Sequence, residues 1–427
     1  MLSKLKQIYT NLTEKGFFHL LSVNLLLQFL SFGSSLFVSK YLSPVELGEI
    51  KIIQSYSNFF LLIAGYGYAT AILKFCSESI EIEQKYGLFR HTLFQSIKTT
   101  GISIAILFFV AYWNVISPSP HINFWLAVYA AIIPFALFTN QAVVLLQAIK
   151  KIKEMAKAQA IIKVQSVICI IILTYYWGFK GFIFATIIAY IAGIVPFFAQ
   201  FPRSVFKKVD IHIPPKYRNV VRYSFMANLV SFVAQNIDIV VLDHFIKDRE
   251  LIGYYSLATL FILGGMQVTY TVQSIATPYF SEKSKDRDWF LTKLKDTSRK
   301  ALILSLLVSI LLFSSAYILV IFYYGKQYMP TLTILFILLV RYVAWTYSSI
   351  TGIALVGLGE MRFNFFMVGI STAVGIIMSF ALVKMYGIIG VATAQVLSAV
   401  TTLLLVRYIG IPAVKNALPT YPCDLNI

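Results

Sequence analysis

The sequence predicts an all-α integral membrane protein with about twelve transmembrane helices in two six-helix lobes related by a parallel repeat. First, the chain of 427 residues is 58% hydrophobic and only 13% charged, whereas soluble domains carry about 25% charged residues. Second, its apolar runs approach the roughly twenty residues that a helix needs to cross a bilayer. Third, its basic residues gather in the short segments between those runs. A soluble fold would leave the apolar runs exposed to water.

The individual helices follow from apolar runs bounded by charges, Gly or Pro. The first run is preceded by three lysines and continues to about Val38. It is too long for the apolar core of a signal peptide, so we interpret it as the first spanning helix. The predicted helices cover residues 17–39, 46–73, 92–116, 122–148, 155–177, 181–202, 219–246, 252–280, 299–324, 329–357, 363–384 and 388–409.

The distribution of basic residues predicts the orientation of the chain. The formal net charge of +18 does not indicate nucleic-acid binding, because the basic residues do not form one continuous surface. When successive connections are assigned to alternate sides of the membrane, most Lys and Arg residues fall on the side of the two termini. Short connections rich in Lys and Arg face the cytoplasm. We therefore expect both termini to be cytoplasmic and the protein to lie in the cell inner (cytoplasmic) membrane.

Two short similarities between the halves suggest an internal repeat. Glu46-Leu47-Gly48 and Glu250-Leu251-Ile252-Gly253 open corresponding helices, and Gly178-x-x-Gly181 is mirrored by Gly387-x-x-Gly390. The alternative is a coincidence among glycine-rich turns. Six helices per half give both halves the same orientation, which is a parallel repeat. The predicted boundaries are an N-terminal lobe over 1–202, a cytoplasmic linker over 203–218, a C-terminal lobe over 219–412 and a cytoplasmic tail over 413–427.

Several segments resemble the polysaccharide transporter branch of the multidrug/oligosaccharidyl-lipid/polysaccharide exporter superfamily, which includes the O-antigen flippases. The resemblance extends over nearly the whole chain, and its motifs are short. The matching segments are 39–48 (SKYLSPVELG), 65–75 (GYGYATAILKF), 236–238 (NID), 253–258 (GYYSLA) and 386–392 (YGIIGVA).

The resemblance implies a V-shaped pair of six-helix lobes around a central cavity. It further implies alternating access, in which an undecaprenyl-pyrophosphate-linked oligosaccharide moves from the inner to the outer leaflet. The oligosaccharide would be an O-antigen or capsule repeat unit. The implied partners are this lipid-linked oligosaccharide, membrane lipids, and a polysaccharide polymerase with its assembly proteins, and no nucleic acid or cofactor is expected.

Cationic side chains within or beside the predicted spans are the first candidates for a substrate site. A charge in the bilayer costs about 2.5–3.5 kcal/mol on insertion scales. Arg341 lies inside the tenth span, where its guanidinium suits a pyrophosphate; the alternative is a structural partner of a carboxylate or carbonyl. Lys163 and Lys74 lie toward the cytoplasmic side, where extension of the side chain to the interface is the alternative. Lys40 and Lys51 lie near the outer mouth, where a solvated charge is the alternative.

Polar and acidic residues complete the candidate set. Asp238 lies with Asn236 in the seventh span, and we interpret the two as an ion-coupling site. Pairing of Asp238 with a basic residue is the alternative. Four amides on the first and fourth spans are further candidates for hydrogen bonding to sugars, with helix–helix association as the alternative. They are Asn24, Gln28, Asn140 and Gln141.

Competing functions are distinguished by charge and by loops. A cation-coupled multidrug antiporter of the same superfamily would place acids in its cavity, whereas the intramembrane charges here are mainly basic. A membrane polysaccharide polymerase or glycosyltransferase would need a large outer loop with clustered catalytic side chains, and the predicted outer connections are short. Gly352-x-x-x-x-Gly357 lacks the Lys-Ser/Thr of a nucleotide-binding loop. We therefore expect a transporter and not an enzyme; a passive scramblase remains open.

Overall fold

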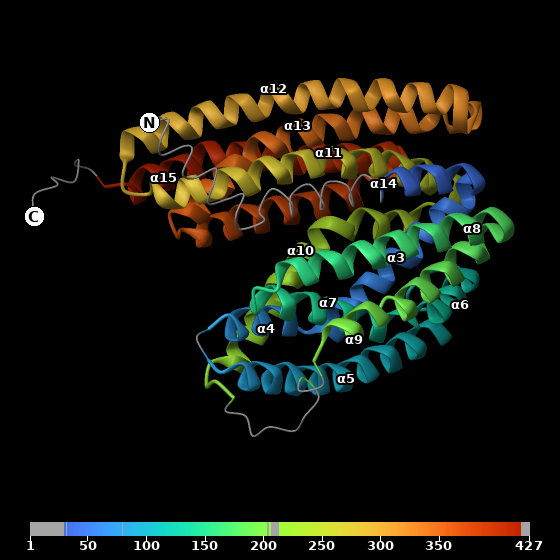
Figure 1. Cartoon of the computed structure of the whole chain (residues 1–427). Helices are drawn as coiled ribbons and strands as arrows, with labels where there is room; N and C mark the ends of the chain where they lie inside the picture. Colours follow the sequence, from blue (N-terminus) through green and yellow to red (C-terminus); the bar gives the residue numbers. More distant parts are fainter. Residues whose placement is uncertain (1–29, 31, 79, 203–204, 206–212, 420–427) are drawn as a thin grey trace, which may run out of the picture. The chain divides into compact units, whose positions relative to one another are not determined.

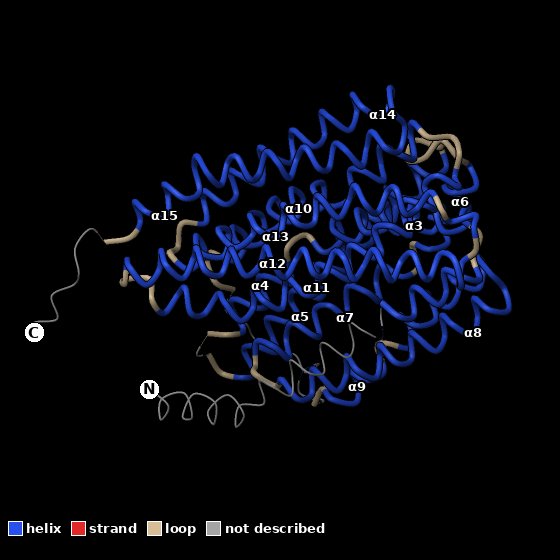
Figure 2. Tube along the Cα trace, turned by 90° about the horizontal axis from the view of Figure 1, so that it is seen from above, coloured by secondary structure: helices blue, strands red, loops and turns tan. Residues whose placement is uncertain are grey.

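The computed structural model describes residues 30, 32–78, 80–202, 205 and 213–419. These residues are almost entirely helical, and Figure 2 shows no strand among them. The elements are α3 (Pro44–Gly65), α4 (Tyr68–Cys76), α5 (Ile82–Tyr112), α6 (Pro120–Tyr129), α7 (Ile132–Ala148), α8 (Ile152–Ala192), α9 (Val195–Gln200), α10 (Tyr217–Phe245), α11 (Arg249–Glu282), α12 (Arg287–Leu319), η2 (Val320–Tyr324), η3 (Lys326–Tyr328), α13 (Pro330–Gly357), α14 (Met361–Leu405), η4 (Val406–Gly410) and α15 (Ile411–Ala417).

The long segments α8 and α14 each contain two helices joined at a glycine. Gly178 has φ 53° and ψ −131°, and Gly387 has φ 55° and ψ −132°. A Cβ built on Gly181 would overlap the carbonyl oxygen of Leu173, and one on Gly390 would overlap that of Leu382. Residues eight apart in one continuous helix lie about 12 Å apart, so the chain reverses direction at both glycines. The two halves therefore repeat the same turn at corresponding positions.

The number of spans agrees with the prediction. Among the residues that the structure describes, seven helices are long and apolar enough to cross a membrane, or nine if each bent pair counts as one span. Dividing α8 and α14 at their glycines makes eleven within the described residues. The predicted first span lies largely outside those residues, although 32–41 are helical. The chain is a multi-pass membrane protein, and the eleven spans of its described residues correspond to eleven of the twelve predicted spans.

Two helices begin earlier than predicted. α5 starts at Ile82 and α12 at Arg287, about ten residues before the apolar runs at 92 and 299 begin. The start of α12 is capped by Asp286, whose side chain accepts a hydrogen bond from the backbone nitrogen of Trp289 at 3.1 Å. A pattern of apolar residues cannot locate a polar helical extension, because only the part inside the membrane must be apolar.

One predicted span is bent where α3 meets α4. The two helices meet at 48°, because Tyr66 (φ 38°) and Gly67 (φ 78°) leave the helical conformation. A Cβ on Gly67 would overlap the carbonyl oxygen of Val221 in α10. The glycine thus provides both the backbone conformation and the room for a close helix crossing.

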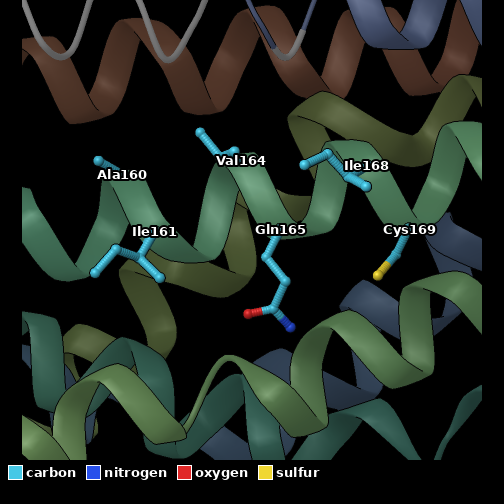
Figure 3. Close-up of a pocket in the computed structure, with 6 residues that line it drawn as sticks. All are labelled: Ala160, Ile161, Val164, Gln165, Ile168 and Cys169. Atoms are coloured by element: carbon cyan, nitrogen blue, oxygen red, sulfur yellow. The ribbon is translucent and has the colours of Figure 1, made fainter.

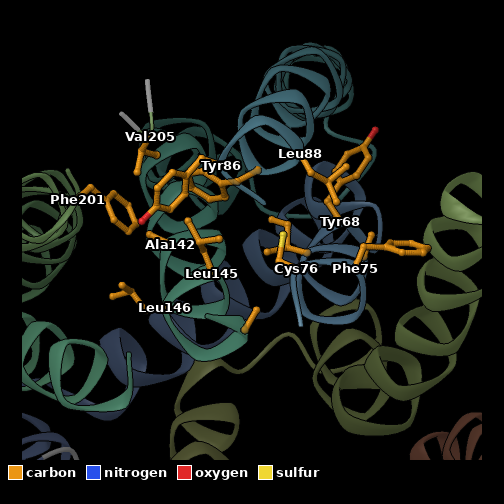
Figure 4. Close-up of a cluster of buried hydrophobic side chains, with 14 of the residues drawn as sticks. Tyr68, Phe75, Cys76, Tyr86, Leu88, Ala142, Leu145, Leu146, Phe201 and Val205 are labelled. Atoms are coloured by element: carbon orange, nitrogen blue, oxygen red, sulfur yellow. The ribbon is translucent and has the colours of Figure 1, made fainter. Parts of the chain in front are cut away.

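The described chain forms two compact units. Unit 1 comprises the residues up to 42 together with 50–232, and unit 2 comprises 43–49 together with the residues from 233 onward. The core of unit 1 contains Tyr68, Phe75, Tyr86, Leu145 and Phe201 (Figure 4). That of unit 2 contains Phe280, Phe290, Ile350, Leu355 and Met367. α3 and α10 each have residues in both units. The units are therefore defined by which residues pack together and not only by their order in the chain.

Candidate functional site

A seam of hydrogen bonds joins α11 to α13 inside unit 2, where α11, α12 and α13 lie side by side (Figure 1). The Tyr342 hydroxyl donates to the Gly265 carbonyl at 3.0 Å, and it lies 3.2 Å from the Thr269 hydroxyl. The residue numbers of the paired positions increase in the same direction along both helices, so α11 and α13 are parallel. This is expected because one span, α12, connects them. The paired positions are Gly265 with Tyr342, Thr269 with Thr346 at 3.1 Å, and Gln273 with Ser349 at 2.7 Å.

Arg341 lies beside this seam on α13. Its side chain is neither fully buried nor fully exposed. Among the described residues, no carboxylate lies within ion-pair distance of Arg341, and no hydrogen bond from its guanidinium is formed. A partly buried charge in a spanning helix is costly unless it is paired or hydrated. Its donors are available to an anionic ligand.

Asp238 is held by a tyrosine in place of a basic residue. It is 5% exposed, and the Tyr255 hydroxyl donates a 2.6 Å hydrogen bond to its Oδ2 atom. The backbone nitrogen of Ile239 donates to Oδ1 at 2.9 Å. Tyr255 therefore contacts one of the two predicted charges, Asp238. No sequence signal links Tyr255 with a residue seventeen positions away.

An aromatic pair stands next to Arg341. Trp345 follows Arg341 by four residues on α13, which places both on one helix face. The ring of Tyr270 meets that of Trp345 edge-on, with 5.6 Å between centroids and 80° between planes. Tyr270 is 45% exposed. Neither ring stands out in a sequence with 26 tyrosines and 5 tryptophans.

The predicted lysines all belong to unit 1. Lys74 is exposed near the end of α4, and its Nζ atom lies 5.4 Å from the centroid of the Phe75 ring. Lys163 on α8 is partly buried and has no ion pair among the described residues. Lys51 on α3 is partly buried, and Lys40 is exposed.

The predicted amides have different environments. Asn140 is exposed, whereas its neighbour Gln141 is 1% exposed, and neither polar atom of its side chain has a hydrogen-bond partner among the described residues. Asn236 is partly buried and lies two residues before Asp238, which places it about 200° away around the helix axis. Asn24 and Gln28 lie outside the described residues.

A shallow hollow of about 480 Å³ runs along α8 (Figure 3). Apart from Gln165 and Cys169, its lining is aliphatic, and it suits a lipid chain better than a polar headgroup. Within the described part of the chain, no cluster of His, Cys, Asp or Glu could hold a metal ion. The hollow is lined by Ala160, Ile161, Val164, Gln165, Ile168 and Cys169.

A family model described as "Polysaccharide biosynthesis protein" matches residues 37–333, which is more than half of the chain. The chain belongs to this family. The match confirms the predicted resemblance at the level of a polysaccharide biosynthesis family. No curated protein matches the chain.

Solved structures show that this polysaccharide biosynthesis protein shares a fold with known transporters. A lipid II flippase MurJ in an inward closed conformation is 17% identical, with a TM-score of 0.76 over 93% of this chain and 90% of that one. An inward-facing multidrug resistance MATE transporter of the MOP superfamily is 14% identical, with a TM-score of 0.75 over 91% and 96%. A eukaryotic MATE transporter is 12% identical, with a TM-score of 0.58 over 94% and 99%.

Proposed function

We propose that the protein moves an undecaprenyl-pyrophosphate-linked oligosaccharide from the inner to the outer leaflet of the cytoplasmic membrane by alternating access. The oligosaccharide is an O-antigen or capsule repeat unit. The family match supports a role in polysaccharide biosynthesis, and the transporter fold supports movement of a molecule in place of catalysis. Both termini face the cytoplasm in this proposal.

Arg341 is the observation that carries the proposal. A flippase must lower the cost of taking an anionic headgroup through a hydrocarbon layer of about 30 Å. The guanidinium of Arg341 has no acidic partner among the described residues, and its planar fork matches two phosphate oxygens. The pyrophosphate supplies a counter-charge that no described side chain provides.

The remaining predicted residues receive supporting roles in this proposal. Lys74 and Lys163 contact the headgroup toward the cytoplasmic mouth, and Lys40 and Lys51 do so toward the outer mouth. The amides Asn24, Gln28, Asn140 and Gln141 contribute hydrogen bonds to sugars. A polymerase and assembly proteins consume the exported unit.

We assign ion coupling to Asp238, with Asn236 on the same helix. The carboxylate of Asp238 is buried and accepts a hydrogen bond from Tyr255, and no basic group in the described residues lies within ion-pair distance of it. A buried carboxylate without a cationic partner is suited to take up a proton or a metal cation. Such uptake would couple transport to an ion gradient.

Complementation tests the proposed function. A strain that lacks its own O-antigen flippase receives this chain together with the matching sugar-assembly and ligation enzymes. We expect restored surface polysaccharide and less lipid-linked oligosaccharide in the inner leaflet. A well-inserted protein that restores nothing and confers resistance to cationic drugs would contradict the proposal. That outcome favours the second candidate, a cation-coupled multidrug antiporter, which the similarity to MATE structures suggests.

A further inference from the structure

The starting observation is the geometry of Arg341, Trp345 and Tyr270. Arg341 and Trp345 are one helical turn apart on α13, so their Cβ atoms are about 5–6 Å apart. Tyr270 of α11 places its ring edge-on against Trp345, with 5.6 Å between centroids. The three side chains form one charged and aromatic patch.

This patch does not suit contact with lipid. A charge that faced hydrocarbon would cost about 2.5–3.5 kcal/mol or more, so the partly exposed Arg341 requires water or a polar ligand. Tyr270 and Trp345 share its surroundings and are not fully buried. Because Trp345 lies one turn from Arg341 and contacts Tyr270, polar surroundings at the guanidinium extend to the two rings.

The hydrogen-bonded seam holds the patch in place. Thr269 precedes Tyr270 on α11, and Thr346 follows Trp345 on α13, and the two threonine hydroxyls are 3.1 Å apart. Thr269 and Thr346 are 2% and 3% exposed. This hydrogen bond links α11 to α13 beside the two rings and so favours a preformed geometry of the ring pair. A preformed site loses less conformational entropy when a ligand binds.

We propose that Trp345 and Tyr270 form a saccharide-binding platform for the sugar that is joined to the pyrophosphate held by Arg341. This inference rests on the proposed function. The C–H face of a pyranose ring carries partial positive charge, and the face of an aromatic ring is negative, so the two stack. Two rings at nearly a right angle form a corner that supports a sugar on its face and on its edge. The single turn between Arg341 and Trp345 matches the short separation between a phosphate and the sugar bonded to it.

The platform predicts selectivity for glycosylated lipid. Arg341 would contribute to the affinity for any polyprenyl pyrophosphate, whereas Trp345 and Tyr270 would contribute only when a sugar is attached. The wild-type protein should therefore bind the glycosylated lipid about tenfold more tightly than the bare one.

Binding of two defined lipids to the full-length protein in nanodiscs tests this platform, with native mass spectrometry as the readout. The probes are undecaprenyl pyrophosphate and undecaprenyl pyrophosphate that carries the repeat-unit oligosaccharide of the complementation strain. We expect Trp345→Ala to lose about tenfold in affinity for the glycosylated lipid only, and Trp345→Phe to retain most of it. Phe336→Ala removes a 62% exposed ring of the same helix and should change neither affinity.

The outcomes separate the platform from the function on which it rests. Equal affinity of the wild-type protein for both lipids, or a loss in Trp345→Ala that is equal for both or absent, would overturn the platform. If, in addition, Arg341→Ala weakens both lipids, pyrophosphate binding stands without the platform. A wild-type protein that binds neither lipid would overturn the proposed function itself.

Discussion

At the residue scale, Asp238 and Arg341 of unit 2 meet different surroundings. Asp238 is nearly fully buried and accepts a 2.6 Å hydrogen bond from Tyr255. Arg341 is only partly buried, and no described side chain pairs with it. The carboxylate of Asp238 is therefore satisfied within the protein, whereas the guanidinium of Arg341 has donors left for a ligand.

Arg341→Ala should fold and lose at least tenfold in transport, because hydrogen bonds to a charged group contribute about 1.5–3 kcal/mol. Arg341→Lys should be intermediate, since lysine keeps the charge and loses the bidentate fork. Restored surface polysaccharide, normalised to protein in the membrane, is the measurement. Arg362→Ala is the control, because Arg362 is exposed and pairs with Glu360 at 2.9 Å. Wild-type transport by Arg341→Ala would remove this residue from the site.

Asp238→Asn should abolish the response of transport to an ion gradient and leave binding of the lipid-linked sugar within about twofold. The amide keeps an oxygen that accepts from Tyr255 but can no longer change its charge. Proteoliposomes with imposed proton or sodium gradients provide the measurement. Asp296→Asn, which affects an exposed acid paired with Lys300, should respond normally. If an imposed ion gradient accelerates transport by Asp238→Asn as strongly as transport by the wild-type protein, coupling through this carboxylate is ruled out.

The charged residues could be found in the sequence because a charge stands out in an apolar run. Tyr255, Tyr270 and Trp345 could not, since their importance comes from neighbours on other helices. Tyr255 is one of 26 tyrosines, and only the packing of α10 against α11 brings it to Asp238.

At the element scale, the glycine turns inside α8 and α14 show how two spans pack without a long loop. The sequence indicates these turns through Gly178-x-x-Gly181 and its repeat. The turn needs glycine at both positions, one for a positive φ and one for a close approach of the backbone. The early starts of α5 and α12 were not visible, since polar helical extensions carry no apolar signal. The α3–α4 bend depends on positive φ angles at Tyr66 and Gly67. Tyrosine rarely adopts a positive φ, so the sequence does not predict one at Tyr66.

Gly181→Ala should lower the yield of folded protein sharply, because its Cβ would overlap the Leu173 carbonyl. The reversal leaves no flexible side chain that could move aside, so we expect destabilisation of at least about 2 kcal/mol. Gly101→Ala is the matched control, since a Cβ there meets no atom within 4 Å. Thermal stability in detergent measures both. Equal melting temperatures for the two variants would contradict the hairpin geometry.

At the scale of the whole molecule, each of the two units contains the same glycine turn, at Gly178 in α8 and at Gly387 in α14. The number of spans and the repeat could be predicted, because bilayer thickness sets helix length and glycine spacing sets the turns. The sequence does not predict that residues 43–49 belong to unit 2 and that 217–232 belong to unit 1. This division depends on packing between helices distant in sequence.

Orientation is a prediction for the whole molecule. In a background without Cys76, Cys169 and Cys423, a membrane-impermeant maleimide added to intact cells should label Lys326→Cys and not Lys293→Cys. The reason is that the 281–300 segment is rich in Lys and Arg and should face the cytoplasm. Permeabilised cells should label both variants. The reverse pattern in intact cells would place the termini outside.

The most direct measurement of the central claim uses purified protein in proteoliposomes that contain a fluorescent undecaprenyl-pyrophosphate-linked oligosaccharide in one leaflet. Appearance of the sugar in the opposite leaflet is followed with an impermeant quencher. We predict transfer by the wild-type protein and at least tenfold slower transfer by Arg341→Ala. Lack of transfer by wild type, together with export of a cationic dye from the same vesicles, would contradict the account.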